Sequence, residues 1–261
     1  FEALEQLGGM LRVGIPDYRL PPEVLDREID YILRTGVTVR TGVRFGADLT
    51  LDDLKKEGFG AVFVGVGAHE CTRLGIPGEE GTEGVLDAVC FLREANLGRC
   101  PSPGRRVVVV GGGNVAVDAV RVARRLGAES VTVVYRRSEA EMPAFADEIQ
   151  GAREEGVQFH FMAAPLEILT RDGRVTGLRC QRTRLGEPDA SGRRRPEPIP
   201  GSEFVIDCDA VIPAIGQRVD LSWAEAACTV DCSPRHLIVA DPVSMQTSIP
   251  GVFAAGDAVS G

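Results

Sequence analysis

Glycines and an alanine follow a run of valines in the middle of the chain. The valines occupy residues 107–110, and Gly111, Gly113 and Ala116 come next with the spacing G-x-G-x-x-A. A helical pattern continues over 114–126, and a second strand-like run begins about 20 residues after the turn. A strand, this turn and a helix form the phosphate-binding unit of dinucleotide-binding folds. We therefore predict a pyrophosphate site here; the alternative is a glycine turn with a structural role.

Each residue type at this turn has a physical reason. Gly111 permits the tight turn out of the strand, and Gly113 lets the backbone approach a pyrophosphate with no Cβ between them. Ala116 keeps the strand and the helix close together. The pyrophosphate would lie on the positive end of the helix. The predicted contacts are Gly111, Gly112, Gly113, Asn114 and Val115.

Two arginines follow the second predicted strand. An NAD site places an acidic residue there for the ribose hydroxyls, whereas an arginine accommodates the 2′-phosphate of NADP. Arg136 and Arg137 stand at this position and no acid does. Planar guanidinium groups suit a bidentate phosphate contact. We therefore predict NADPH rather than NADH; the alternative is a solvated arginine pair bonded to Glu139 or Glu141.

Alternating helices and strands must position these residues. Helices are predicted at 23–33, 51–56, 85–97, 114–126 and 145–155, and strands at 37–39, 61–66, 106–110, 131–135, 157–161, 210–214 and 237–240. A hairpin is predicted from 166–170 and 175–183 across Asp172-Gly173. Residues 186–200 are predicted to be a polar, basic loop. The basic tract 193–195 within it is predicted to be a solvated loop or hairpin tip; the alternative is a nucleotide contact. The alternation predicts an α/β fold, a mostly parallel sheet with helices on both faces.

Glycine also stands where predicted strands meet loops near both ends of the chain. Gly8 and Gly9 lie close to the start, Gly67 closes the apolar run at 61–66, and Gly256 precedes Asp257. Glycine at such a junction lets a ligand approach the backbone. An acid after it can accept hydrogen bonds from sugar-like hydroxyls. Each of these segments, taken singly, is better explained as a turn.

In combination these motifs resemble a known family. The glycines at 8–9, the turn at 111–118, the arginines at 136–137, the segment at 152–156 and the stretch at 245–257 match in this order. They are similar to the small (beta) subunit of glutamate synthase and its relatives among the two-dinucleotide-binding-domain flavoproteins. The resemblance covers essentially the whole chain. Two places depart from it: Asn114-Val115 replaces a frequent Asp-Thr, and Arg218-Val219 replaces a frequent x-Pro.

The resemblance implies a Rossmann-like NAD(P)-binding domain inserted into a partial FAD-binding domain. Residues 1–72 and 207–261 would form the FAD part, and residues 73–206 the NAD(P)H part. It also implies a fragment: the first FAD strand and any cysteine-rich iron–sulfur region would precede Phe1, and the helix after Asp257 would be absent. The residues implied to share the binding of FAD with those missing segments are Glu2, Gly8, Gly9, Leu11, Gly67, Gly256 and Asp257.

The function implied by the resemblance is hydride transfer between NADPH and FAD. Electrons would pass on to iron–sulfur centres in another domain or a larger catalytic subunit. No side chain is expected to act as nucleophile or general acid, and the histidines at 69, 160 and 236 show no catalytic spacing. A disulfide reductase would need a C-x-x-C pair, which the seven cysteines at 71, 90, 100, 180, 208, 228 and 232 do not form. A non-catalytic NAD(P)H-binding module is the other alternative.

The composition argues against several other classes. Thirty-eight acids against 29 bases give a net charge of −9, which disfavours general affinity for nucleic acid. The longest apolar runs are too short to cross a bilayer, so no membrane partner is expected. The first residues show no secretory signal. Scattered cysteines without a pairing pattern indicate reduced thiols in a cytoplasmic protein.

Overall fold

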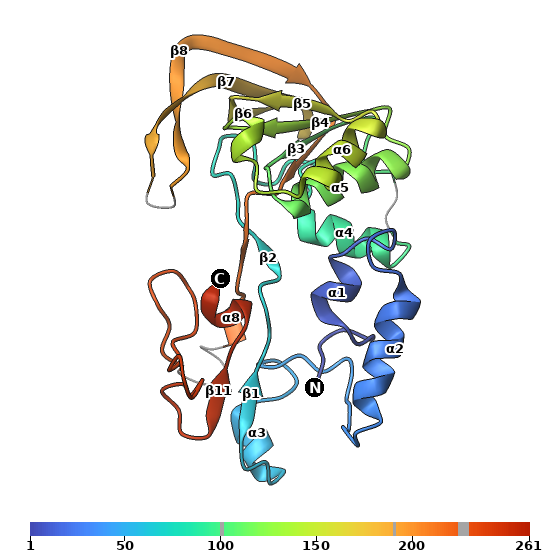
Figure 1. The fold of residues 1–261 in the computed structure, drawn as a ribbon, viewed down its shortest axis with the longest axis vertical. Coiled ribbons are helices and arrows are strands. Elements are labelled where there is room, and N and C mark those ends of the chain that lie inside the picture. Colours follow the sequence, from blue (N-terminus) through green and yellow to red (C-terminus); the bar gives the residue numbers. More distant parts are fainter. Residues whose placement is uncertain (100–101, 190–191, 224–229) are drawn as a thin grey trace. The chain divides into compact units, whose positions relative to one another are not determined.

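The computed structural model describes residues 1–99, 102–189, 192–223 and 230–261. Cys100, residue 101 and Cys228 lie outside these ranges. The chain divides into two compact units (Figure 1), one formed by Phe1–Glu70 with Gln217–Gly261 and the other by Cys71–Gly216. The predicted boundaries were 72/73 and 206/207. The second boundary lies later because residues 210–213 form a strand of the second unit.

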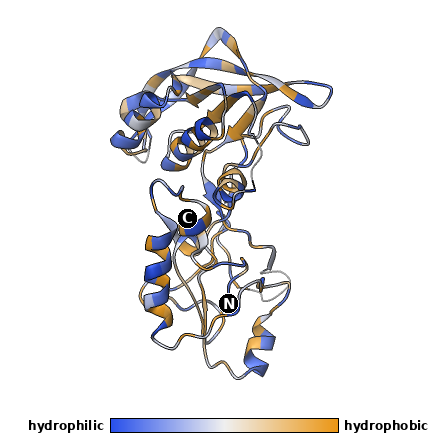
Figure 2. Ribbon diagram, turned by 90° about the vertical axis from the view of Figure 1, so that its right-hand side faces the viewer, coloured by the Kyte–Doolittle hydropathy of each residue, from blue (hydrophilic) through white to orange (hydrophobic). Residues whose placement is uncertain are grey.

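A four-stranded parallel sheet forms the centre of the second unit. Its order is β5-β4-β3-β9, built from β3 (Arg106–Val110), β4 (Ser130–Tyr135), β5 (Gln158–Phe161) and β9 (Ala210–Pro213). The central strands are nearly continuous apolar runs and are drawn in orange in Figure 2. Such runs are typical of parallel strands because both faces of the sheet are covered.

Helices cover one face of this sheet. α5 (Asn114–Arg125) packs on β3 and β4, with α4 (Ala88–Asn96) and α6 (Ala146–Glu154) beside it. Apart from Asp118, the buried residues of α5 are alanines and valines, which allow a close approach to the strands. Gly127 follows the helix with a φ of 94°, the left-handed conformation that commonly ends a helix.

Strands cover the opposite face, where helices were predicted. β6 (Ala163–Arg171), β7 (Arg174–Pro188) and β8 (Arg194–Asp207) form an antiparallel sheet in the order β6-β7-β8. Leu178 and Cys180 of this sheet share one core with Val108 and Val110 of β3. The expectation of helices on both faces was therefore wrong, because the long hairpin buries its apolar side chains against the parallel strands.

The turns of this antiparallel sheet were predicted with mixed success. Asp172 and Gly173 have φ values of 52° and 76°, the conformation of a tight hairpin turn. The polar loop predicted at 186–200 was wrong, because β7 extends to Pro188 and pairs with β8 from Arg194. The prolines at 196, 198 and 200 obscured the strand. β8 is an edge strand, where a missing N–H costs no ladder bond.

The first unit contains a short parallel sheet, β1 (Val62–Val64) with β11 (Val252–Ala254). Its helices include α1 (Gly9–Val13), α2 (Pro22–Leu33), α3 (Leu51–Lys56) and α8 (Asp257–Ser260). The predicted strand at 37–39 is not formed, and 237–240 makes only isolated bridges. A helix does follow Gly256, contrary to expectation, since α8 begins at Asp257.

The remaining elements are short. β2 (Glu70–Cys71) pairs with β10 (Gln217–Arg218), and a 3-10 turn, η1, spans Glu139–Glu141. Within the part of the chain that the structure describes, none of the helices is long and apolar enough to cross a membrane.

An ion-pair cluster joins α5 to the end of α6. Arg121 and Arg125 both bind the carboxylate of Glu155, at 2.9 Å each. Burial raises the pKa of Glu155, but the hydrogen bonds from Arg125 and Arg121 outweigh it and lower the pKa below its ordinary value. A lowered folded-state pKa stabilises the protein above the unfolded pKa, and this contribution is lost as the pH falls through the folded pKa.

We expect Glu155→Gln to lower the free energy of unfolding by about 1 to 3 kcal/mol at pH 7. The difference from wild type should shrink as the pH falls below about 4.3, where the unfolded carboxylate takes up a proton, and should vanish once the pH is below the lowered folded-state pKa. Urea unfolding at pH 7 and at pH 3.5 measures both values. Glu154→Gln is the control, because the Glu154 side chain is exposed and, among the residues that the structure describes, is bonded only to Gln150. An equal loss at both pH values would contradict the ion-pair explanation.

Candidate functional site

The glycine turn lies at the carboxyl end of β3, where α5 begins. Gly111 has a φ of 151°, a value that favours glycine. A Cβ placed on Gly111 would lie 2.2 Å from the carbonyl oxygen of Ala214 and 3.3 Å from the Cβ of Ala116. The backbone at Gly111 is therefore packed so closely against its neighbours that no side chain fits there. Ala116 is fully buried.

The segment after β4 folds back onto this turn. A Cβ on Gly112 would lie 2.5 Å from the ring of Tyr135, whose hydroxyl donates to the Glu141 carbonyl oxygen at 2.8 Å. Ala144 N–H donates to the Gly112 carbonyl oxygen at 3.1 Å. These contacts were not predicted from the sequence. The segment that makes them includes the Met-Pro pair at 142–143.

Gly113 differs from Gly111 and Gly112 because the space beside it is open. It caps α5 with φ −88° and ψ 176°, and no atom lies within 4 Å of the position of a Cβ. The first N–H groups of a helix have no partner inside the helix, and Gly113 has no side chain to bond them. Open space and unsatisfied donors at a positive helix end fit a pyrophosphate.

The first residues of α5 complete this turn. The Asn114 side-chain oxygen accepts a hydrogen bond from Phe145 N–H at 3.1 Å, which fixes the start of α6 beside the start of α5. Val115 is half-buried at the second position of the helix. Neither side chain closes the space beside Gly113, whose Cβ position has no neighbour. Asparagine and valine are therefore compatible with the same turn as the more frequent Asp-Thr.

The two predicted arginines have different surroundings. Arg136 is exposed, and its side chain makes no hydrogen bond or ion pair within the described ranges. Arg137 is 5% exposed; its guanidinium donates to Asp189 at 2.7 Å and to the Arg194 carbonyl oxygen at 2.8 Å. Their predicted alternative partners are engaged elsewhere, Glu139 with Arg153 at 2.6 Å and Glu141 with Ser138.

In the first unit, two of the predicted glycines lie at the same sheet edge. β1 and β11 are parallel, with Val64 opposite Ala254, so Gly67 and Gly256 both follow the carboxyl ends of paired strands. Their φ values are 69° and 74°, and no atom lies within 4 Å of a Cβ on Gly256. Asp257 is exposed and opens α8. The pairing of β1 with β11 thus brings Gly67 and Gly256, which are far apart in sequence, to the same edge of the sheet.

The other predicted residues of this unit make different contacts. The Glu2 carboxylate accepts from Leu4 N–H at 2.8 Å, and its backbone bonds to Arg40 and Val43. Gly8 has a φ of 119° and packs against Leu25, whose side chain would lie 2.9 Å from a Cβ there. After it come Gly9, with open space beside it, and Leu11, which is 51% exposed.

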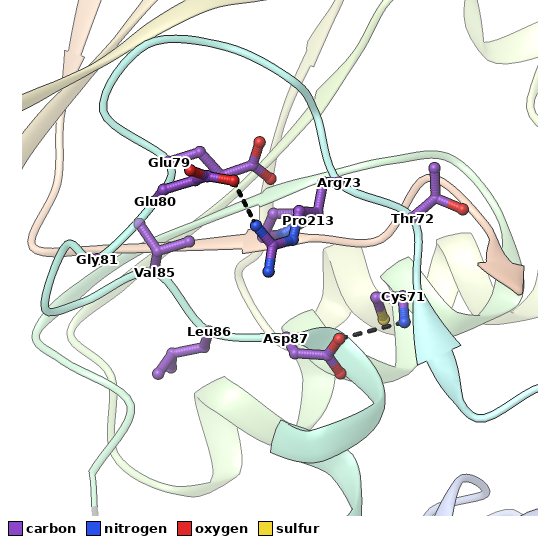
Figure 3. Close-up of a pocket in the computed structure, with 10 residues that line it drawn as sticks. All are labelled: Cys71, Thr72, Arg73, Glu79, Glu80, Gly81, Val85, Leu86, Asp87 and Pro213. Carbon is purple, nitrogen blue, oxygen red and sulfur yellow. Dashed lines mark hydrogen bonds and ion pairs between the residues drawn. The ribbon is translucent and has the colours of Figure 1, made fainter. Parts of the chain in front are cut away.

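A pocket of about 440 Å³ lies beside the end of β9 (Figure 3). Its charged side chains are bound to one another or to the backbone. Arg73 pairs with Glu80 at 2.6 Å, and Asp87 accepts from Cys71 N–H at 3.2 Å. The buried Glu79 carboxylate accepts from the backbone N–H groups of residues 74 and 75. These bonds hold the connecting segment 71–87 in shape.

The described cysteines and histidines are candidate residues for covalent or metal chemistry. Burial raises the pKa values of Cys71, Cys180 and Cys208 to about 12, so these thiols stay protonated at neutral pH. The five cysteines that the structure describes are free. His160 stacks on Phe204. Within the described ranges, no group of three or more His, Cys, Asp or Glu could hold a metal ion.

Solved structures of low sequence identity share this fold. FprA from Mycobacterium tuberculosis in complex with NADPH has a TM-score of 0.79 and 19% identity, and the match covers 99% of this chain and 71% of that one. Thioredoxin reductase from T. acidophilum has a TM-score of 0.66 and 21% identity over 98% of this chain and 80% of that one. At these identities the likeness shows the fold alone.

Curated relatives are closer in sequence. NADP(+)-dependent formate dehydrogenase subunit beta from Moorella thermoacetica is 51% identical over the whole chain, and glutamate synthase [NADPH] small chain from Escherichia coli (strain K12) is 39% identical over the whole chain. The chain spans 37% of the former and 58% of the latter. The family profile described as pyridine nucleotide-disulphide oxidoreductase matches residues 9–261. The chain therefore belongs to this family of flavin-dependent oxidoreductases, whose members bind FAD and NADPH.

Proposed function

We propose that this chain is the NADPH–FAD module of a larger oxidoreductase of the glutamate synthase small-subunit type. The observation that carries the proposal is the open space beside Gly113, at the start of α5 and after a buried strand. The relatives named as formate dehydrogenase subunit beta and glutamate synthase small chain support the assignment to a multi-subunit enzyme. Electrons pass from this module to iron–sulfur centres in another domain or a larger catalytic subunit.

The second unit binds NADPH in this proposal. The backbone at 111–113 and the first N–H groups of α5, from Asn114 and Val115, hold the pyrophosphate. Arg136 contacts the 2′-phosphate, because it is exposed beside the turn and its side chain has no bond within the described ranges. Arg137 adds positive charge behind it while remaining bound to Asp189.

The first unit contributes to the binding of FAD, together with further segments of the parent protein. Gly256 and Asp257 approach the ribityl–pyrophosphate part, and Gly67, at the same sheet edge, passes near the flavin. Glu2 holds the adenosine ribose, and Gly8, Gly9 and Leu11 line the flavin. When bound, the FAD exchanges a hydride with NADPH, and the protein supplies binding and orientation. The free thiols fit a cytoplasmic setting.

The arginine assignment is tested by titrating the purified chain with NADPH and with NADH in a calorimeter. We expect Arg136→Ala to weaken NADPH binding by about 10- to 100-fold, the worth of one charge-assisted hydrogen bond, and to leave NADH binding unchanged. Arg174→Ala is the control, since Arg174 is exposed and pairs with Glu83 at the β6–β7 turn. Equal binding of NADPH and NADH by the wild-type chain would contradict the assignment.

A further inference from the structure

The hairpin formed by β7 and β8 reaches the arginine pair through Arg137. The Arg137 guanidinium donates to Asp189 Oδ2 at 2.7 Å and to the Arg194 carbonyl oxygen at 2.8 Å. Asp189 N–H in turn donates to the Arg193 carbonyl oxygen at 2.7 Å, and Arg193 N–H donates to Asp189 Oδ1 at 3.3 Å. A single carboxylate therefore links the end of the hairpin to the loop after β4.

Thr183 holds the same loop from the middle of β7. Its hydroxyl donates to the Arg136 carbonyl oxygen at 2.7 Å. Thr183 N–H donates to the Met162 carbonyl oxygen at 2.8 Å, and Met162 N–H donates to the Arg137 carbonyl oxygen at 3.0 Å. Thr183 is only 5% exposed, next to a register shift between Gln181 and Thr183. An irregularity of this kind re-aims a side chain toward the core.

These bonds give the two arginines their different exposure. Both backbone carbonyls are bonded, and the Arg137 side chain is buried against the hairpin. The exposed Arg136 side chain is thus the part of the loop left for a ligand. A buried ion pair contributes little net stability compared with apolar packing. Its presence directly behind a ligand-binding loop therefore favours a role in orientation.

We infer that Arg137, Thr183 and Asp189 form a hairpin clamp that positions Arg136 for the 2′-phosphate of NADPH. The inference rests on the proposed function of Arg136. The clamp residues are positioning residues, since they act on the phosphate through the conformation of the 136–137 loop. A held loop loses less conformational entropy when it binds, so the clamp raises the affinity for the 2′-phosphate and leaves the pyrophosphate contacts unchanged.

The test compares two fragments of the cofactors, adenosine 2′,5′-bisphosphate and AMP, which differ only in the 2′-phosphate. Thr183→Val and Asp189→Asn are expected to weaken binding of the bisphosphate by about two- to tenfold, the range that one net hydrogen bond corresponds to. AMP binding should not change. Thr183→Ser keeps the hydroxyl and should bind like wild type. Thr176→Val is the matched control, because Thr176 is another threonine of β7 whose hydroxyl donates to a backbone carbonyl, that of Leu169 on β6.

The outcomes separate this inference from the proposed function. Weaker binding of both fragments in Thr183→Val, or equal loss in Thr183→Ser, would show a structural role only and overturn the clamp. Thermal unfolding of each variant identifies loss of fold as the cause. If Arg136→Ala does not change the preference for the bisphosphate, the proposed role of Arg136 fails. If Arg136→Ala removes the preference but Thr183→Val and Asp189→Asn keep it, the clamp alone is overturned.

Discussion

Replacing Gly113 with valine is expected to abolish dinucleotide binding without unfolding the protein. The backbone angles at Gly113, φ −88° and ψ 176°, are accessible to any residue. No atom lies within 4 Å of the position of its Cβ, so the first carbon of a side chain fits there. The valine side chain would occupy the space in which the pyrophosphate lies. Losing two or more charge-assisted hydrogen bonds weakens binding by at least about 100-fold.

Calorimetric titration of Gly113→Val with NADPH and NADH measures this loss, which should be equal for the two because they share the pyrophosphate. The unfolding temperature should stay close to that of wild type. Gly60→Val is a matched control, since Gly60 also has open space beside it but lies in the first unit. A Gly113→Val protein that binds NADPH with wild-type affinity would place the pyrophosphate elsewhere.

Replacing Gly111 with valine is expected to destabilise the second unit directly. The φ of 151° at Gly111 is strained for residues with a side chain. The new Cβ would lie 2.2 Å from the Ala214 carbonyl oxygen, a backbone atom that cannot move without disturbing β9. Such overpacking combined with backbone strain costs at least about 3 kcal/mol. The free energy of unfolding of a typical domain is only about 5 to 15 kcal/mol, so this cost is a large fraction of it.

Urea unfolding of Gly111→Val and Gly113→Val side by side measures the difference between two glycines of one motif. The midpoint should fall strongly for Gly111→Val and little for Gly113→Val. Circular dichroism shows whether the Gly111 variant folds at all. Wild-type stability in Gly111→Val would mean that β3 and β9 are not packed around a bare backbone at this turn.

The amino-acid sequence alone determined the elements of the second unit around the glycine turn. β3 was predicted with its observed limits, and α5, β4 and α6 to within a residue or so. These signals are local. Glycine frees the backbone at the turn, the valine run requires a strand buried on both faces, and Gly127 ends the helix. Each of these signals depends on residues that are adjacent in sequence, so the element can be predicted without knowing which segments pack against it.

Tertiary structure decided the features that depend on distant partners. The edge strand β8 has no apolar alternation, and its backbone pairing with β7 defines it as a strand. Parallel pairing of β1 with β11 brings Gly67 and Gly256 to one sheet edge. Arg136 and Arg137 are adjacent and identical in type, so they differ only in their tertiary contacts, such as the ion pair of Arg137 with Asp189. Burial and pairing are properties of the folded chain, because they arise between segments whose order in sequence does not specify their contacts.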